Sequence, residues 1–249
     1  MSNSPLYDQA YIDTGDGPVV ILLHGLFGKL AMWRPTIDAL KQNYRVIVPR
    51  LPILELPTEH TNIHHLSELL HQFIEWHNLK DVNLVGHAIG GQVALSYSHD
   101  HPGNVYRIVL SGCSGLVDSN DLDAATSAEV GDYNYVEEHV RQAFYRSDDA
   151  PEALVHDIYA TVQSKAKRRN ISSLVRSSRR DSVETFLNKL DHRVMLLWGL
   201  EDRITPPETA LHFHDFLQNS EIRFIEKCGH LPMIEEPGLF TGHLISFLD

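Results

Sequence analysis

A short apolar run that leads into three closely spaced glycines is the feature of this 249-residue chain that most restricts its fold. Residues 82–85 have the uniform hydrophobicity of a strand buried on both faces, and Gly86-His87-Ala88-Ile89-Gly90-Gly91 follows directly. Glycine is needed there because a side chain would collide with the neighbouring strand or helix in so tight a turn. This is the G-x-S-x-G frame of a sharp strand-to-helix turn, whose centre is normally a nucleophilic serine. Here the centre is Ala88, which has no nucleophilic atom.

The segments on either side of this turn alternate between strand and helix patterns. Buried strands are predicted at residues 19–23, 45–48, 82–85, 105–111, 194–198 and 221–225. Helical spacing of apolar residues is found at residues 31–41, 62–79, 91–101, 206–217 and 239–248. This order predicts an α/β fold with a doubly wound, mostly parallel sheet.

The alternation stops in one long central segment. Residues 114–190 are polar, show helical periodicity and contain no clear strand. We therefore expect residues 1–113 and 191–249 to form the α/β core, and residues 114–190 to form a helical cap inserted into it.

The composition excludes several classes of function. The longest apolar run is far too short to cross a membrane, and the first residues lack the pattern of a secretory signal. Two cysteines do not make a disulfide framework, so we expect a cytoplasmic protein. A net charge of −12 argues against nucleic acid or an anionic membrane as partner. We expect a monomer or homodimer that acts on a small molecule.

Two further motifs each follow a predicted strand. One is Trp198-Gly199-Leu200-Glu201-Asp202, and the other is Gly229-His230-Leu231-Pro232. Open α/β sheets bind their ligands at the carboxyl ends of the strands. We therefore expect Ala88, Asp202 and His230 to lie close together at that edge of the sheet.

With His24-Gly25 after the first buried strand, these motifs appear in the order nucleophile position, acid, base. In this respect the chain resembles the α/β-hydrolases, in particular the capped esterases and C–C-bond hydrolases. The resemblance extends over essentially the whole chain except the cap. It implies hydrolysis of a carboxylic ester, or of a related acyl or C–C bond, in a small apolar substrate, with no metal and no cofactor.

The same resemblance assigns roles to individual residues. His230 would be the general base, and Asp202 would orient it. The backbone N–H groups of Ile89 and Leu26 would hold the oxyanion, with Phe27 as the second choice. Phe27 and Met233 flank the catalytic loops and are expected to line the substrate pocket.

Ala88 leaves three interpretations open. We favour a serine that was replaced by design to inactivate the enzyme, because His230, Asp202 and the oxyanion loop are all retained. A second is a natural ligand-binding or receptor member of the same fold. A third is base chemistry by His230 and Asp202 alone, or with a relocated nucleophile such as Cys113 or Cys228, although a packing role is the commoner use of such thiols.

Two clusters outside these motifs have ordinary and functional explanations. The histidines at positions 60, 64, 65 and 71 could bind a metal. We favour a solvated helix face, because no carboxylate or thiolate completes a convincing ligand set. Seven of the 21 basic residues lie within residues 165–180. They could steer or clamp an acidic substrate, or they could form solvated helix faces of the cap.

Overall fold

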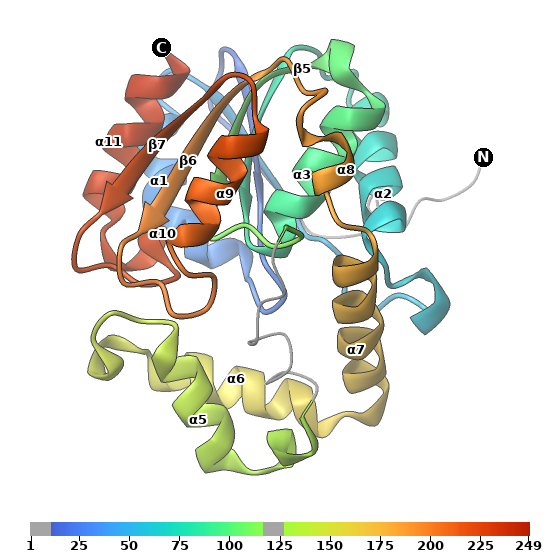
Figure 1. Cartoon of the computed structure of the whole chain (residues 1–249), viewed down its shortest axis with the longest axis vertical. Coiled ribbons are helices and arrows are strands. Elements are labelled where there is room, and N and C mark those ends of the chain that lie inside the picture. Colours follow the sequence, from blue (N-terminus) through green and yellow to red (C-terminus); the bar gives the residue numbers. More distant parts are fainter. Residues whose placement is uncertain (1–10, 117–126) are drawn as a thin grey trace.

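The computed structural model describes residues 11–116 and 127–249. It contains one sheet in the order β1-β3-β2-β4-β5-β6-β7 (Figure 1). The strands are β1 (Tyr11–Thr14), β2 (Val19–Leu23), β3 (Arg45–Pro49), β4 (Val82–His87), β5 (Val105–Ser111), β6 (Arg193–Gly199) and β7 (Ser220–Ile225). Every neighbouring pair is parallel except β1 with β3. The predicted α/β fold with a doubly wound, mostly parallel sheet is confirmed.

Alternate side chains of the central strands enter two separate cores, one on each face of the sheet. In β2, for example, Ile21 and Leu23 belong to one buried cluster, and Val20 and Leu22 belong to the other. A strand enclosed in this way must be apolar at every position, which is why its sequence shows no alternation.

Helices cover both faces of the sheet (Figure 1). On one face α1 (Arg34–Leu40) packs against α11 (Pro237–Leu248), and on the other α2 (Ile63–Trp76) packs against α3 (Ile89–Asp100). In the described ranges, three shorter helices also pack on the sheet: α8 (Glu184–Leu187), α9 (Glu208–Phe216) and α10 (Pro232–Glu235). α8 lies within residues 114–190, which were expected to form the cap, but its Leu187 is buried in a core of the sheet. Single 3₁₀ turns are η1 (Leu30–Trp33), η2 (Thr58–His60), η3 (Pro102–Asn104), η4 (Ala128–Gly131) and η5 (Ser147–Asp149).

Three helices between β5 and β6 make up most of the segment expected to be a cap. They are α5 (Tyr133–Gln142), α6 (Glu152–Gln163) and α7 (Lys165–Arg180). The arrowheads of β6 and β7 point towards α5 and α6, which lie beyond the sheet (Figure 1). Valines and isoleucines of these helices form a third, smaller apolar cluster. Leu174 of α7 instead belongs to a core of the sheet, so α7 joins the two parts.

No helix in the described ranges 11–116 and 127–249 has both the length and the hydrophobicity that a membrane span requires.

Candidate functional site

The turn between β4 and α3 holds Ala88 in a backbone conformation that alanine rarely adopts. Its φ is 51° and its ψ is −119°. The surroundings enforce this geometry: a Cβ placed on Gly90 would lie 2.4 Å from the carbonyl oxygen of Leu23, and one on Gly86 would lie 2.5 Å from the Cα of Gly91. Such backbone strain costs about 1–3 kcal/mol and persists only where the surrounding structure imposes it.

The loop after β2 lies directly against this turn. A Cβ placed on Gly25 would lie 3.1 Å from the Cβ of Ala88. His24 fixes the loop, because its Nε2 accepts the N–H of Leu51 at 3.0 Å and its Nδ1–H donates to the carbonyl of Gly25 at 2.8 Å. Burial lowers the pKa of His24, which keeps the ring in this neutral form.

The two backbone donors proposed for the oxyanion are both available. Within residues 11–116 and 127–249, neither the N–H of Leu26 nor that of Ile89 has a hydrogen-bond acceptor. Both residues line the same cavity as Ala88. A ligand oxygen placed between them would satisfy two donors that are otherwise unpaired.

His230 and Asp202 form a buried hydrogen-bonded pair. The Nδ1–H of His230 donates to Asp202 Oδ2 at 2.9 Å. The carboxylate also accepts the N–H groups of Ile204 (2.8 Å) and Thr205 (2.9 Å) on Oδ1, and the hydroxyl of Thr205 on Oδ2 (3.0 Å). This arrangement places the proton of His230 on Nδ1 and leaves Nε2 as the basic nitrogen.

A second buried histidine, His87, supports His230 and was missed in the sequence. Its Nε2–H donates to the carbonyl of His230 at 2.9 Å, and the two rings lie 4.6 Å apart. Burial, and then the nearby charge of His230, hold the pKa of His87 well below its usual value of 6.5. In the sequence, the only indication that His87 belongs to the site is that it directly precedes Ala88. A neutral His87 adds no repulsion when His230 takes up a proton.

The buried His87 makes stability depend on pH. Because the pKa of His87 is lower in the folded protein than in the unfolded chain, the unfolded state binds the proton first as the pH falls. Above about pH 6.5 the free energy of unfolding does not depend on the protonation of His87. Below this pH it falls by up to ~1.4 kcal/mol per pH unit. We expect the urea midpoint to fall between pH 7.5 and pH 5.5, and to fall less in His87→Asn. An unchanged slope in that variant would contradict the assignment. Burial also lowers the pKa of His24, His77 and His101, so these histidines contribute to the slope that remains.

Gly112, just after β5, lies against the His230–Asp202 pair. Its φ is +53°, and a Cβ there would lie 2.7 Å from His230 Cε1 and 3.3 Å from Asp202 Oδ2. No local pattern in the sequence indicates that this glycine borders the site.

We expect Gly112→Ala to destabilise the protein by about 1–3 kcal/mol, since the new methyl group meets both the strained φ and the imidazole. Gly103→Ala is the matched control, because nothing lies within 4 Å of its added Cβ. Denaturant unfolding of both variants measures the difference. Equal stabilities would show that the His230 loop moves aside freely.

The loop that carries His230 is bound to the cap as well as to the core. The N–H of His230 donates to the carbonyl of Ala143 at 2.8 Å. The carboxylate of Glu235 accepts N–H groups from Tyr145 of the cap (2.7 Å), Gly229 (3.1 Å) and Leu231 (3.2 Å). Burial raises the pKa of Glu235, against the effect of these donors. The side chain of Glu235 therefore links the loop that carries His230 to the cap.

A cavity of about 500 Å³ lies between the cap and the turn at Ala88. Ala88, His230, Leu26, Phe27 and Ile89 all line it, together with largely apolar side chains of α5 and α6. Its charged lining residues are Lys29 and Asp157, which pair with each other between core and cap.

The structure corrects the expectation for Met233. Its side chain is fully buried in the core that contains α1 and α11, and it does not line the cavity. Leu231 and Ile234 line the cavity instead. They are three residues apart around the start of α10, so they share a face from which residue 233 points away.

The structure gives no support to a relocated cysteine nucleophile. Cys113 and Cys228 are fully buried, and neither lines the cavity. Burial raises the pKa of both thiols, which disfavours the reactive thiolate.

The four histidines near α2 do not converge. The rings of His60 and His65 lie 5.0 Å apart, whereas His71 stacks on His101 at 3.8 Å. In the described part of the chain, no three His, Cys, Asp or Glu side chains are grouped so as to hold a metal ion.

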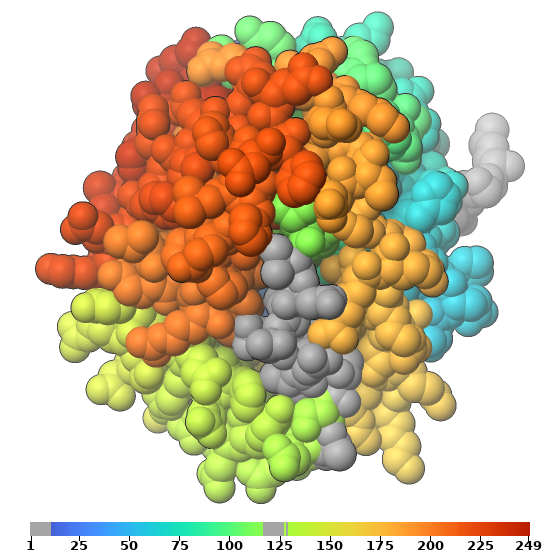
Figure 2. All heavy atoms as spheres, in the orientation of Figure 1, coloured from blue at the N-terminus to red at the C-terminus, as the bar shows by residue number. Residues whose placement is uncertain are grey.

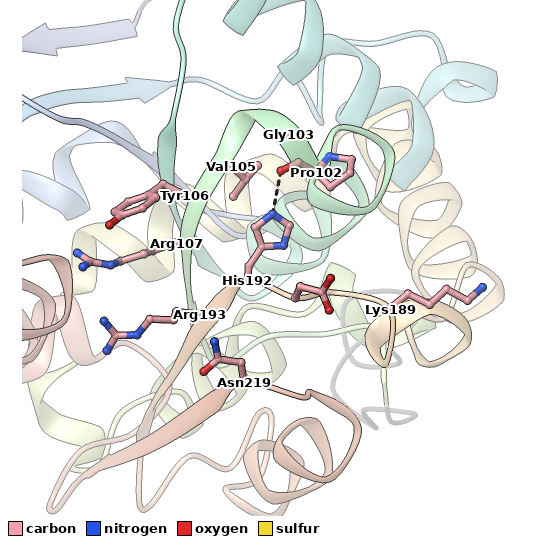
Figure 3. Close-up of a pocket in the computed structure, with 10 residues that line it drawn as sticks. Pro102, Gly103, Val105, Tyr106, Arg107, Lys189, His192, Arg193 and Asn219 are labelled. Carbon is pink, nitrogen blue, oxygen red and sulfur yellow. Dashed lines mark hydrogen bonds between the residues drawn. The ribbon is translucent and has the colours of Figure 1, made fainter.

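A second hollow lies at the opposite end of the sheet, where β5 and β6 begin. Arg107 and Arg193 are register partners there, and the side chain of Lys189 points away from both (Figure 3). The Nη1 of Arg107 donates to the carbonyl of Leu248. The guanidinium groups of Arg107 and Arg193 both lie over the ring of Phe247, so they already have a partner within the protein. This hollow is therefore a weaker candidate site than the cavity at Ala88.

A profile of the Alpha/beta hydrolase family matches residues 20–241. The chain belongs to this family. Among curated relatives, this α/β-hydrolase is 29% identical to the 2-hydroxy-6-oxo-6-(2'-aminophenyl)hexa-2,4-dienoic acid hydrolase of Metapseudomonas resinovorans, over 96% of this chain and 86% of the relative. It is 26% identical to the 2-hydroxy-6-oxo-2,4-heptadienoate hydrolase of Pseudomonas putida, over 95% of this chain and 91% of the relative.

Solved structures show the same fold. An α/β-hydrolase from the sediment metagenome of the Mar Chica lagoon superimposes with a TM-score of 0.78 at 26% identity, covering 95% of this chain and 93% of its own. A meta-cleavage product hydrolase from Pseudomonas fluorescens IP01, solved as a serine-to-alanine mutant with acetates, gives a TM-score of 0.85 at 22% identity, covering 96% and 93%. At that identity the second likeness concerns the fold of this α/β-hydrolase alone.

Proposed function

We propose that this α/β-hydrolase binds a small, largely apolar carboxylic ester, or a related acyl or C–C-bond substrate, and that Ala88 stands where a nucleophilic serine acts. The observation that carries the proposal is the strained backbone of Ala88, at φ 51° and ψ −119°. Strain of this kind is retained where a turn has to present a side chain to a ligand. Alanine itself gains nothing from it.

The surrounding groups fit the chemistry of a serine hydrolase. A hydroxyl at position 88 would give its proton to His230, whose tautomer Asp202 maintains. The hydroxyl oxygen would then attack the carbonyl carbon, and the N–H groups of Leu26 and Ile89 would hold the resulting oxyanion. His230 would finally return the proton to the leaving group.

With Ala88 in place, no acyl-enzyme forms, and we expect this chain to be inactive or nearly so. Water attack assisted by His230 would leave at most a residual rate. The intact tautomer of His230 is the observation that favours this residual base chemistry. The competing function is ligand binding without catalysis. It would use the same cavity and would require no proton transfer.

A covalent probe tests the proposed position of the nucleophile. We expect a fluorophosphonate to label Ala88→Ser at residue 88 and to leave the parent chain unlabelled, as measured by intact mass and peptide mapping. Labelling should be lost when His230→Gln is added, because the serine then has no base. If the parent chain is labelled in the cavity, or if Ala88→Ser stays unlabelled, the proposed assignment of position 88 fails.

A further inference from the structure

The outer face of α7 carries a concentration of positive charge that the proposed chemistry does not use. Seven of its 16 residues are Lys or Arg, and none is acidic. The rest of the chain contains 14 basic against 33 acidic residues. The net charge of −12 therefore conceals a separation of charge, with one strongly basic helix on an acidic protein.

The basic residues fall on one side of the helix. At 100° per residue, six of the seven lie within an arc of about 120°, which extends about 22 Å along the axis. We call this set the basic stripe: Lys165, Arg168, Arg169, Arg176, Arg179 and Arg180. Figure 2 shows the ochre residues of this part of the chain exposed on the surface that faces the viewer, and Figure 1 places α7 at the side of the molecule.

Hydrogen bonds on the opposite face fix the rotation of α7. Asn170 Nδ2 donates to the carbonyl of Leu56 at 2.7 Å, and its Oδ1 accepts the hydroxyl of Thr58 at 2.7 Å. Further along the helix, the hydroxyl of Ser177 accepts the N–H of Ile63 at 2.9 Å. These bonds hold the basic stripe on the outside.

Among residues 11–116 and 127–249, carboxylates pair with only part of this positive charge. Arg180 pairs with Asp181 at 2.9 Å. For Lys165, Arg168, Arg169 and Arg176, the described residues provide no carboxylate within ion-pair distance. The first turn also lacks an acidic residue, so its cations oppose the helix dipole and repel one another at i,i+4 spacing. The helix keeps an arrangement that weakens it locally, which is expected of a surface that binds an anionic partner.

The chemistry of the basic stripe narrows the class of partner. α7 contains no aromatic side chain on which nucleic-acid bases could stack, and its one amide, Asn170, is buried and already paired. The arc of the stripe carries no large apolar side chain that could anchor a protein partner. The stripe is thus a row of exposed or partly exposed Lys and Arg side chains, and such a row suits a partner whose negative charge is spread over a surface.

We propose that the basic stripe docks the protein onto an anionic lipid surface, with the axis of α7 parallel to the membrane. Exposed Lys and Arg side chains near such a surface are each attracted without a fixed pocket. Salt screens charge over about 8 Å at physiological ionic strength, so acidic residues farther than this from the headgroups oppose docking little. Docking through the cap would also bring the apolar cavity close to a source of apolar molecules. This inference does not depend on the role of Ala88.

Vesicle binding tests the proposal directly. We expect the full chain to cosediment with phosphatidylcholine:phosphatidylserine vesicles (7:3) at 0.1 M salt, and not with phosphatidylcholine alone. The double variant Arg169→Gln, Arg176→Gln should bind about 25-fold more weakly, since each charge contributes about fivefold. The control Lys80→Gln, Arg223→Gln makes the same change in net charge at exposed positions of the core, and it should bind within twofold of the parent.

Three outcomes would overturn the proposal. One is equal binding to both kinds of vesicle, and another is an equal loss in both double variants, which would reflect net charge alone. The third is tighter binding to a single-stranded oligonucleotide than to the vesicles at the same salt, which would assign the basic stripe to nucleic acid. Circular dichroism and thermal unfolding of each variant confirm that a loss of binding is not a loss of fold.

Discussion

Ala88→Ser is expected to turn this chain into an active esterase, with a gain in kcat on the order of a million-fold, judged from the effect of removing the serine of a serine protease. The strained turn is already formed, so the new hydroxyl replaces one hydrogen of a methyl group that points from a preset backbone. His230 has its proton on Nδ1, and the N–H groups of Leu26 and Ile89, which we propose as oxyanion donors, have no competing acceptor in the described residues. Hydrolysis of short-chain p-nitrophenyl esters, with a pre-steady-state burst, measures the gain.

Ala31→Ser is the matched control for this experiment. Ala31 lines the same cavity but lies on η1, away from the turn. It should leave the activity at the level of the parent chain. If Ala88→Ser turns over no ester, thioester or lactone, the chain is better described as a binding protein, or as one that performs base chemistry alone. Equal activity of the parent and Ala88→Ser would place the nucleophile elsewhere.

Asp202→Asn, introduced into the Ala88→Ser protein, is expected to lower kcat by about 10⁴-fold, a magnitude known from the corresponding change in a serine protease. The hydrogen bonds determine how the new amide must lie. Oδ1 of Asp202 accepts two backbone N–H groups, so the NH₂ cannot occupy that position. It must take the position of Oδ2 and donate to His230 Nδ1. The proton of His230 then moves to Nε2, and the base loses the lone pair that accepts the serine proton.

Glu201→Gln provides the control, because it removes the same charge one residue earlier. Glu201 accepts the N–H of Cys228 and is not bonded to His230. We expect its kcat to stay within about tenfold of the Ala88→Ser protein, with KM little changed in both variants. A similar loss in the two variants would mean that net charge, and not the tautomer of His230, governs the rate.

The sequence predicted the elements with strong local signals. Buried strands, amphipathic helices and the glycine frame around Ala88 depend on neighbouring residues, and the structure has them close to the predicted bounds. The edge strand β1 was not predicted, because Tyr11–Thr14 is only partly buried and pairs antiparallel with β3. The position of Met233 was predicted wrongly, because distance from His230 along the chain does not say which way a side chain faces on a short helix.

Other parts of the site depend on contacts between distant segments. Gly112 and His87 contact His230, which is more than a hundred residues away in the chain, so no local pattern reveals them. The hydrogen bonds from Ala143 to His230 and from Tyr145 to Glu235 are of the same kind. Conversely, the basic residues of α7 were obvious in the sequence, but only the fold shows that they share one exposed face.

Hydrogen bonds join the cap to the loop that carries His230, and they bear on where the cavity can open to admit a ligand. Lifting the cap at Ala143 and Tyr145 would break one hydrogen bond to the backbone of His230 and another to Glu235. His230 would therefore be displaced whenever a ligand was admitted from that side. Elsewhere on the cavity wall, the exposed Lys29–Asp157 pair is the ion pair that joins core and cap among residues 11–116 and 127–249. A ligand that enters on that side would leave His230 in position, and it would have to separate the Lys29–Asp157 ion pair. The rate of ligand admission should therefore rise with salt while the chemistry at His230 stays the same.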